Sequence, residues 1–157
     1  MFADGSSYRQ QLRLRVCGIL VIDGRILVAR LHSPIVDKPI WTPPGGGLTF
    51  GESLAQGVRR EFFQETGVEV SVGQLVHINE MIEPPFHAVE FYFEVHRESG
   101  EPALGHDPEH PADQQLLQDL QWIPIDKLPS LDFFPQSLIS KLQRWEQRSD
   151  FNPYKSS

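Results

Sequence analysis

The sequence is poor in cysteine and contains no long apolar run. Its one cysteine, Cys17, excludes a disulfide within the chain, and its apolar surroundings at 16–22 favour a buried core thiol over a nucleophile. No apolar segment reaches the roughly 20 residues that a membrane-spanning helix needs. Residues 1–11 also lack the apolar region of a signal peptide. We therefore expect a cytoplasmic protein with no membrane partner.

Positive charge is also scarce. The chain has 14 Lys and Arg residues against 21 Asp and Glu residues, which gives a formal net charge of −7. Since long nucleic acids are held largely by clustered Lys and Arg, this balance argues against long DNA or RNA as a partner. An acidic protein can still bind a small polyphosphate when divalent cations lie between its carboxylates and the phosphates.

The length and composition are those of one globular domain. Of the 157 residues, 39% are hydrophobic and 22% are charged, and a chain of this length can bury a core without disulfides. We expect a flexible N-terminus over residues 1–11, a single domain over 12–148 and a flexible tail over 149–157.

Short β-rich runs alternate with turn signals along the chain. Asp23-Gly24 joins the first two runs and suits a two-residue hairpin turn, whereas the Pro- and Gly-rich passage 33–51 is predicted to be a shaped loop. The expected strands cover 12–22, 25–31, 68–72, 75–82, 89–96 and 121–125, and the expected helices cover 53–66, 113–120 and 135–148. This order favours an α/β fold with a mixed sheet covered on both faces.

Two of these segments have a clear periodicity. In 89–96 the apolar residues alternate with polar ones, and we interpret the face with Glu90 and Glu94 as solvent-exposed. The opposite face would carry Val89, Phe91, Phe93 and Val95. Segment 135–148 has Leu138, Leu142 and Trp145 at helical spacing, which predicts one packed amphipathic helix.

The helix predicted over 53–66 places two carboxylates on its buried face. It is bounded by a capping box that starts at Ser53 and by Gly67 as a stop. At about 100° per residue, Glu61 and Glu65 continue the apolar stripe of this helix. A carboxylate directed into a domain costs several kcal/mol unless it is paired or bound to a metal. The two acids therefore either converge on a hard cation such as Mg²⁺, or Glu61 pairs with a base and Glu65 is solvated.

A glycine-rich loop precedes this helix. In the stretch 43–47, two prolines are followed by three glycines, which let the backbone approach a ligand or offer a carbonyl to a metal. Together with the acids of the following helix, this loop outlines a phosphate and metal site.

The spacing of Gly46, Glu52 and the run 60–68 resembles the signature of the Nudix hydrolases. The resemblance implies an α/β/α sandwich with a central mixed β-sheet. It also implies hydrolysis of a diphosphate linkage in a nucleoside diphosphate derivative, such as a nucleoside triphosphate, a nucleotide sugar or ADP-ribose, with Mg²⁺ or Mn²⁺. The partner would be a small-molecule nucleotide, and homodimer formation is left open.

The resemblance also implies a role for each residue of the motif. Gly46 would give a backbone carbonyl to the metal, and Glu61 and Glu65 would be metal ligands, with Glu61 as the candidate base. Glu52 would assist at the metal shell. Arg60 would orient the carboxylates by pairing with one of them.

One position departs from the family pattern. Gln64 stands where the family usually has a third glutamate, and it keeps an oxygen ligand but lacks the negative charge. The alternative function is therefore a catalytically weakened Nudix-fold module that binds or senses a nucleotide. Acids that would compensate are Glu90, Glu94, Glu101, Asp107, Glu109, Asp113 and Asp119.

Four further residues are candidates for substrate binding. Gly45 and Gly47 flank the predicted metal carbonyl, and their backbone would lie against the substrate. Trp41 would either stack on a base or anchor the core. Arg30 would either meet a phosphate or form a surface salt bridge.

Overall fold

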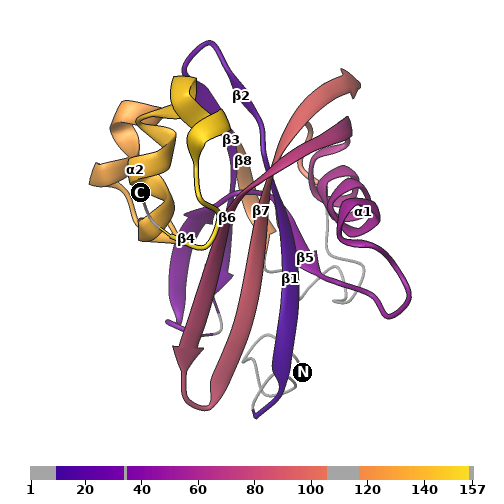
Figure 1. The fold of residues 1–157 in the computed structure, drawn as a ribbon, viewed down its shortest axis with the longest axis vertical. Coiled ribbons are helices and arrows are strands. Elements are labelled where there is room, and N and C mark those ends of the chain that lie inside the picture. Colours follow the sequence, from indigo (N-terminus) through magenta and orange to yellow (C-terminus); the bar gives the residue numbers. More distant parts are fainter. Residues whose placement is uncertain (1–9, 34, 106–116, 156–157) are drawn as a thin grey trace.

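The computed structural model describes residues 10–33, 35–105 and 117–155 (Figure 1). Its strands are β1 (Leu12–Ile19), β2 (Val21–Ile22), β3 (Arg25–Ser33), β4 (Lys38–Thr42), β5 (Gly45–Gly47), β6 (Glu69–Glu83), β7 (Phe86–Ser99) and β8 (Leu117–Pro124). Its helices are α1 (Leu54–Thr66) and α2 (Ile139–Leu142), with the short 3₁₀ segments η4 (Ile125–Ser130), η5 (Gln136–Leu138) and η6 (Trp145–Asp150).

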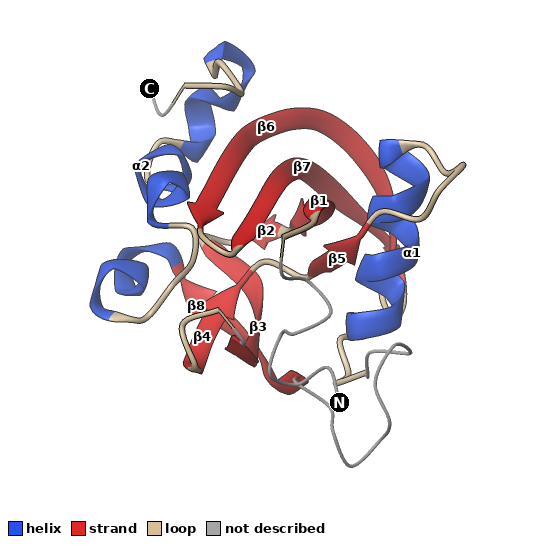
Figure 2. Ribbon diagram, turned by 90° about the horizontal axis from the view of Figure 1, so that it is seen from below, coloured by secondary structure: helices blue, strands red, loops and turns tan. Residues whose placement is uncertain are grey.

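The strands form two sheets with helices on opposite sides. The first sheet has the order β5-β1-β7-β6, and in the second β3 pairs with β2, β4 and β8. The β1–β7 pair is parallel and the β1–β5 and β6–β7 pairs are antiparallel, so the first sheet is mixed. Figure 2 shows β6 and β7 curving between α1 and the C-terminal helical segments. The predicted α/β sandwich with a central mixed sheet is confirmed.

The predicted hairpin is present, but its first strand is divided. Asp23 and Gly24 have φ values of 53° and 74°, the left-handed conformation that a tight hairpin turn requires, and β2 pairs with β3 on either side of them. The single strand predicted over 12–22 is wrong, because the chain changes sheets at Leu20. β1 pairs with β5 and β7, whereas β2 pairs with β3.

The passage 33–51, predicted to be a loop, contains two strands. β4 pairs with β3, and β5 pairs with β1. Only a glycine fits at Gly45, since a Cβ there would lie 2.3 Å from the carbonyl oxygen of Val16. The loop prediction is wrong at these strands. β4 forms a local hairpin with β3 although it contains a proline, and β5 consists of three glycines whose partner β1 is distant in sequence.

Strand β6 replaces two predicted strands, and β7 has an unexpected buried face. β6 runs without a break from Glu69 to Glu83. Its pairing with β7 is irregular, because the register shifts at three places between Glu69 and His77. On β7, Glu90 and Glu94 are only 2% and 7% exposed. The interpretation of their face as solvent-exposed is wrong, because the strand is covered on both sides and polar groups are paired on one of them.

The predicted helix over 135–148 is broken into η5, α2 and η6. Leu138 and Leu142 are buried in the core as the helical spacing predicted, and Trp145 packs against the same cluster. Arg144 leaves the helical conformation, with φ −117° and ψ 36°, and so separates α2 from η6. Of the predicted helix 113–120, residues 117–120 belong to β8, and the rest lies outside the described residues.

The buried Lys141 ties this C-terminal region to β6. Its side chain is fully buried, and its ammonium donates to the Val76 carbonyl at 3.0 Å and to the Asn152 carbonyl at 2.8 Å. The Ile78 amide also donates to the Pro153 carbonyl at 2.8 Å. These contacts place residues 152–153, which belong to the tail predicted to be flexible, against the edge of the first sheet.

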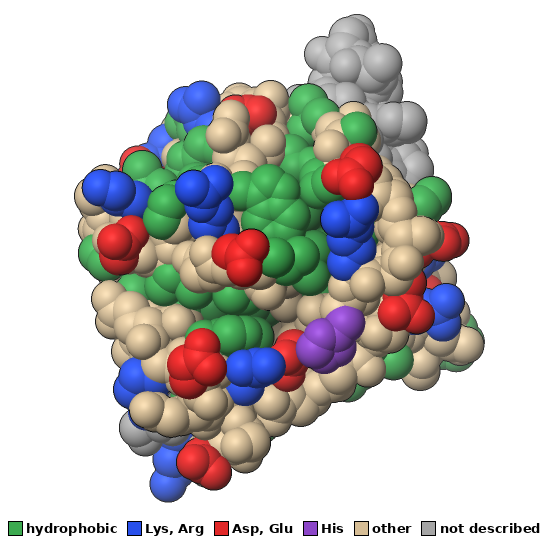
Figure 3. Space-filling model, turned by 90° about the horizontal axis from the view of Figure 1, so that it is seen from above, with side chains coloured by type: hydrophobic (Ala, Val, Ile, Leu, Met, Phe, Trp, Pro, Cys, Tyr) green, Lys and Arg blue, Asp and Glu red, His purple; other side chains and the backbone are tan. Residues whose placement is uncertain are grey.

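The surface carries both signs of charge. On the face shown in Figure 3, acidic and basic side chains are interspersed around a central group of hydrophobic ones. Within the described part of the chain, no helix has the length and apolar character needed to cross a membrane.

Candidate active site

Helix α1 is fixed at both ends by the signals that predicted it. The Ser53 hydroxyl accepts a hydrogen bond from the Gln56 amide at 3.1 Å, and the Gln56 side chain accepts one from the Ser53 amide at 2.8 Å. Gly67 ends the helix with φ 73°. The rotation of the helix is thereby set, and Val58 and Phe62 pack into the core between α1 and the first sheet.

The two predicted carboxylates lie on this buried side, against the glycines of β5. Glu61 and Glu65 are 7% and 8% exposed. The Gly45 amide donates to Glu65 Oε1 at 3.1 Å. A Cβ on Gly46 would lie 2.3 Å from Glu61 Oε2, so only a glycine leaves room for this carboxylate. The structure therefore brings together Glu61, Glu65 and the Gly45–Gly46 backbone.

Arg60 holds the carboxylates from the outer side of the helix. It donates twice to Glu52, at 2.6 and 3.0 Å, and once to Glu61 at 3.0 Å. Its remaining hydrogen bonds go to the Gly47 carbonyl at 3.0 Å and to Gln64 Oε1 at 3.3 Å. These hydrogen bonds with Arg60 lower the pKa of Glu52 to about 2, so Glu52 is ionised at neutral pH.

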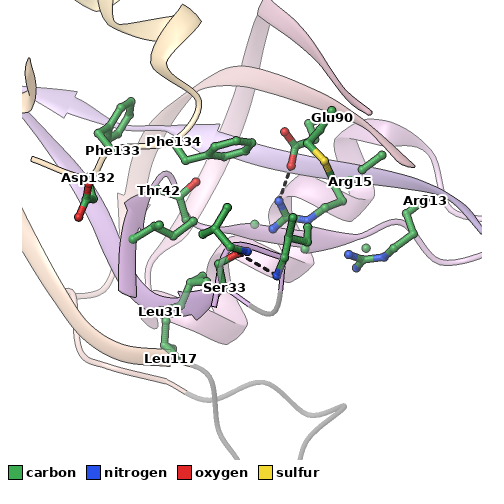
Figure 4. Close-up of a pocket in the computed structure, with 18 of the residues that line it drawn as sticks. Arg13, Arg15, Leu31, Ser33, Thr42, Glu90, Leu117, Asp132, Phe133 and Phe134 are labelled. Atoms are coloured by element: carbon green, nitrogen blue, oxygen red, sulfur yellow. Dashed lines mark hydrogen bonds and ion pairs between the residues drawn. The ribbon is translucent and has the colours of Figure 1, made fainter. Parts of the chain in front are cut away.

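A cavity of about 360 Å³ lies between the two sheets, next to these carboxylates. At its charged end, β1 contributes Arg13 and Arg15, and α1 contributes Glu61 and Glu65. Its other end is largely apolar and is formed by Leu31, Ile40, Thr42, Phe133 and Phe134. Figure 4 shows the two phenylalanines and Thr42 on the side of the cavity opposite Arg13 and Arg15. This volume is within the range of small-molecule sites.

Sequence reasoning missed the ion pair in the wall of this cavity. Arg15 donates to Glu90 Oε2 at 2.6 Å across the parallel β1–β7 pair (Figure 4). Burial opposes ionisation of Arg15, but the nearby Cys17 and Glu90 outweigh it and raise the pKa of the guanidinium. Burial raises the pKa of Cys17 to about 12, which agrees with its interpretation as a core thiol. Alternating charge on β1, with Arg13 and Arg15 facing the same side, was the available signal.

A chain of hydrogen bonds leads from the buried Lys141 through the exposed Ser137 to this ion pair. Burial and the neighbouring Lys141 lower the pKa of His77 to about 4, so its ring is neutral at pH 7 and Nδ1 accepts from the ammonium at 3.0 Å. His77 Nε2 then donates to Ser137 at 2.8 Å, and Ser137 donates to Asn79 Oδ1 at 3.3 Å. Asn79 Nδ2 donates to Glu90 Oε1 at 2.9 Å. Each member has one consistent direction of donation, which fixes the Glu90 carboxylate that holds Arg15.

The structure places the remaining candidates away from the cavity. Arg30 is exposed and lies opposite Trp41 in the β3–β4 pair, and Trp41 packs against the core. Neither of them lines the cavity. Gln64 is half-buried beside Arg60. Gly47 lines the cavity together with Gly45.

Of the seven acids considered as compensating metal ligands, one lines the cavity and three have other partners. Glu90 lines the cavity, Glu94 pairs with Arg148, and Glu101 pairs with Arg97. Asp119 accepts from the Leu120 amide. The other three, Asp107, Glu109 and Asp113, lie outside the described residues.

The sequence is similar to those of a known pyrophosphatase and a known phosphatase. The chain is 28% identical over 148 residues to the ADP-ribose pyrophosphatase of Methanocaldococcus jannaschii, which covers 91% of this chain and 81% of that protein. It is 28% identical over 141 residues to phosphatase NudJ of Escherichia coli, covering 88% and 85% of the two chains.

Solved structures show the same fold. The MutT NUDIX hydrolase of Burkholderia pseudomallei superposes with a TM-score of 0.67 at 25% identity, over 85% of this chain and 97% of that one. The NUDIX hydrolase of Nitrosomonas europaea superposes with a TM-score of 0.70 at 19% identity, over 91% and 93%. The model of the NUDIX domain matches residues 11–142, which include the whole of α1 and its two buried carboxylates. The chain therefore belongs to the NUDIX domain family.

Proposed function

We propose that this Nudix pyrophosphohydrolase cleaves the diphosphate linkage of a nucleoside diphosphate derivative with the help of Mg²⁺ or Mn²⁺. The observation that carries the proposal is the burial of Glu61 and Glu65 against the Gly45–Gly46 backbone, at the edge of a cavity large enough for a small molecule. One similar protein, an ADP-ribose pyrophosphatase, supports this class of substrate.

The residues at this edge fit a hard divalent cation. Among the described residues, no group of three or more metal-binding side chains is assembled in advance. Mg²⁺ is commonly held by one or two carboxylates, with substrate phosphates and water completing its shell, and Glu61 and Glu65 are such a pair. We assign them as ligands together with the Gly46 carbonyl. The bound cation would neutralise phosphate charge and activate a water molecule.

Arg60 and Glu52 prepare the site without contacting the substrate. Arg60 is half-exposed, and its guanidinium forms ion pairs with both the ionised Glu52 and Glu61. These contacts hold the Glu61 carboxylate in one orientation. Glu61 is the residue that we propose takes the proton of the attacking water. Glu90 is less suited to this role, because it already accepts from Arg15, Asn79 and Tyr92.

Arg13 and Arg15 place positive charge in the same cavity. They lie two residues apart on β1, so both face the side on which Gly45–Gly47 and the α1 carboxylates lie. We propose that they bind the phosphate that lies farther from the metal. Since Arg15 is already paired with Glu90 and the lining contains more acids than bases, the phosphates would still need the cation for charge balance.

The alternative function is nucleotide binding without cleavage, which Gln64 favours. Its Oε1 accepts from Arg60 at 3.3 Å, so the amide occupies the place beside Arg60 where a carboxylate would make a stronger, charge-assisted hydrogen bond. Gln64 would also reach the metal shell with one neutral oxygen only. Separate measurements of nucleotide binding and nucleotide cleavage therefore distinguish the two functions.

A substrate panel tests the proposed function. Nucleoside triphosphates, nucleotide sugars, ADP-ribose and dinucleotides are incubated with Mg²⁺, and released phosphate, pyrophosphate and nucleoside monophosphate are measured. We expect cleavage of at least one class at a diphosphate bond, and loss of that cleavage in excess EDTA. Full turnover in EDTA would exclude the metal role, and nucleotide binding without any product would favour the sensor.

Gly46→Ala tests the contact between β5 and Glu61. The new Cβ would lie 2.3 Å from Glu61 Oε2 and displace it, and a misplacement of about 1 Å costs on the order of 100-fold in rate. We expect kcat to fall about 100-fold. The matched control is Gly47→Ala, whose Cβ meets its nearest atom, in the Arg13 side chain, at 3.6 Å and should cause a much smaller loss. Equal losses in the two variants would show that this contact is not what positions Glu61.

Gln64→Glu tests whether the missing charge weakens the metal site. We expect the variant to need less Mg²⁺ for half-maximal activity and to form the same products, because a third carboxylate strengthens attraction to a divalent ion. If the wild type is a sensor, the variant should instead create cleavage. Phe63→Glu, which adds the same charge at an exposed neighbouring position, is the control. An unchanged Mg²⁺ dependence in Gln64→Glu would show that residue 64 does not reach the metal shell.

A further inference from the structure

Arg15, Glu90 and Asn79 form one row across three strands. Glu90 on β7 is the register partner of Arg15 on β1 and of Asn79 on β6. Register partners point to the same face of a sheet, so the three side chains lie together on the face that carries the cavity. Arg15 and Glu90 line the cavity, whereas Asn79 does not. An effect of Asn79 on a ligand in the cavity therefore passes through Glu90.

The two oxygens of the Glu90 carboxylate have different partners. Oε1 accepts from Asn79 Nδ2 at 2.9 Å and from the Tyr92 hydroxyl at 3.3 Å. Oε2 accepts from Arg15 at 2.6 Å (Figure 4). The Glu90 side chain is only 3% exposed, so water does little to hold it. The shorter bond to Oε1, which comes from Asn79, thus holds the carboxylate in the orientation that presents Oε2 to Arg15.

The orientation of the Asn79 amide is itself determined by its neighbours. An asparagine can present either its nitrogen or its oxygen to a neighbour. Here the series of hydrogen bonds begins at the Lys141 ammonium, which only donates, and ends at the Glu90 carboxylate, which only accepts. Between them, His77 donates to Ser137, and Ser137 donates to Asn79 Oδ1 at 3.3 Å. The amide nitrogen therefore faces Glu90.

Arg15 keeps donors for a ligand. Among the described residues, Glu90 is the one group that accepts a hydrogen bond from its guanidinium. The guanidinium carries further N–H groups in a planar fork that suits the oxygens of a phosphate. Because the bond to Glu90 fixes one part of this fork, it also determines where the other N–H groups point.

We propose that Asn79 is a positioning residue for substrate binding: through Glu90 it holds the Arg15 guanidinium where its other N–H groups reach a phosphate oxygen of the substrate. The assignment rests on the proposed function, because it takes the charged end of the cavity as the place of the diphosphate. A residue outside the cavity then contributes to substrate affinity, and Ser137 connects this contribution to the C-terminal segment.

Equilibrium binding tests the assignment without any hydrolysis. The probe is methylenediphosphonate, a diphosphate analogue whose P–C–P link is not hydrolysed, and its dissociation constant is measured by calorimetry with Mg²⁺. Asn79→Leu, which has a similar size and no amide, should weaken binding about tenfold, because Glu90 loses the donor that orients it. Ser137→Ala should weaken binding about threefold, because Asn79 keeps its amide and loses only its own partner. Ser137 is exposed, so this second variant is expected to fold.

The matched control is Gln74→Met. Gln74 Nε2 donates to Glu94 Oε1 at 3.2 Å, which is the same kind of bond between the same two strands. Glu94 is also buried, but it does not line the cavity. The control should therefore bind the probe as the wild type does.

The state of the Arg15 guanidinium is measured directly by ¹⁵N NMR of arginine-labelled protein without ligand. Its signals are assigned by their absence in Arg15→Lys. We expect separately resolved N–H signals in the wild type and in Gln74→Met, because the bond to Glu90 slows rotation of the guanidinium. In Asn79→Leu the same signals should broaden and merge. A purely structural role of Asn79 would lower the thermal midpoint and change neither these signals nor the affinity for the probe.

Unchanged binding in Asn79→Leu would overturn the assignment, and so would equal losses in Asn79→Leu and Gln74→Met. If Asn79→Leu does not fold, unchanged binding in Ser137→Ala overturns it instead. A wild type that does not bind the probe would contradict both the assignment and the proposed function. A wild type that binds the probe but cleaves no nucleotide derivative would contradict the proposed function alone.

Discussion

The site depends on the contact between the buried carboxylates of α1 and the side-chain-free backbone of β5. Glu61 occupies the space that a Cβ of Gly46 would fill, and Glu65 accepts a hydrogen bond from Gly45. The same glycines pair with β1, so the helix is tied to the central sheet at the point where the charge is buried. Burying such charges costs several kcal/mol unless partners compensate. Arg60, Gly45 and the proposed cation are these partners.

The Arg15–Glu90 pair in the cavity wall is fixed by a second set of polar groups. The ammonium of Lys141 starts a directed series of hydrogen bonds that ends at Glu90, which pairs with Arg15. This series crosses β6 and β7 and connects the C-terminal segment to the charged end of the cavity. Such a network restricts the positions of its buried members, Lys141, His77 and Glu90, because a missing partner would leave one of them unpaired. The core fold and the proposed substrate site thus share their polar groups.

What could be predicted from the sequence was local. The limits of α1 follow from the capping box at Ser53 and from Gly67, and the stripe that includes Glu61 and Glu65 follows from helical periodicity. β5 could not be predicted, because its partner β1 is remote in sequence and its three glycines resemble a loop. β4 pairs with the preceding strand β3, but the prolines in and after it resemble a loop. Alternation on β7 separated its two faces correctly, but periodicity does not tell which face is buried when both are covered. Thr42, Arg15 and Phe134 are missed for the same reason, since they meet only through tertiary contacts.

If the buried carboxylates serve catalysis at the expense of stability, Glu65→Gln should change the two properties in opposite directions. Glu65 lies in the last turn of α1, where the helix dipole disfavours an acid by about 0.3 to 1 kcal/mol. Glutamine keeps the oxygen that Gly45 contacts and removes the charge. Thermal unfolding and kcat are measured for both proteins with the same substrate. We expect an unchanged or higher melting temperature and a kcat lower by orders of magnitude. Strong destabilisation together with wild-type turnover would contradict the account and make Glu65 a structural residue.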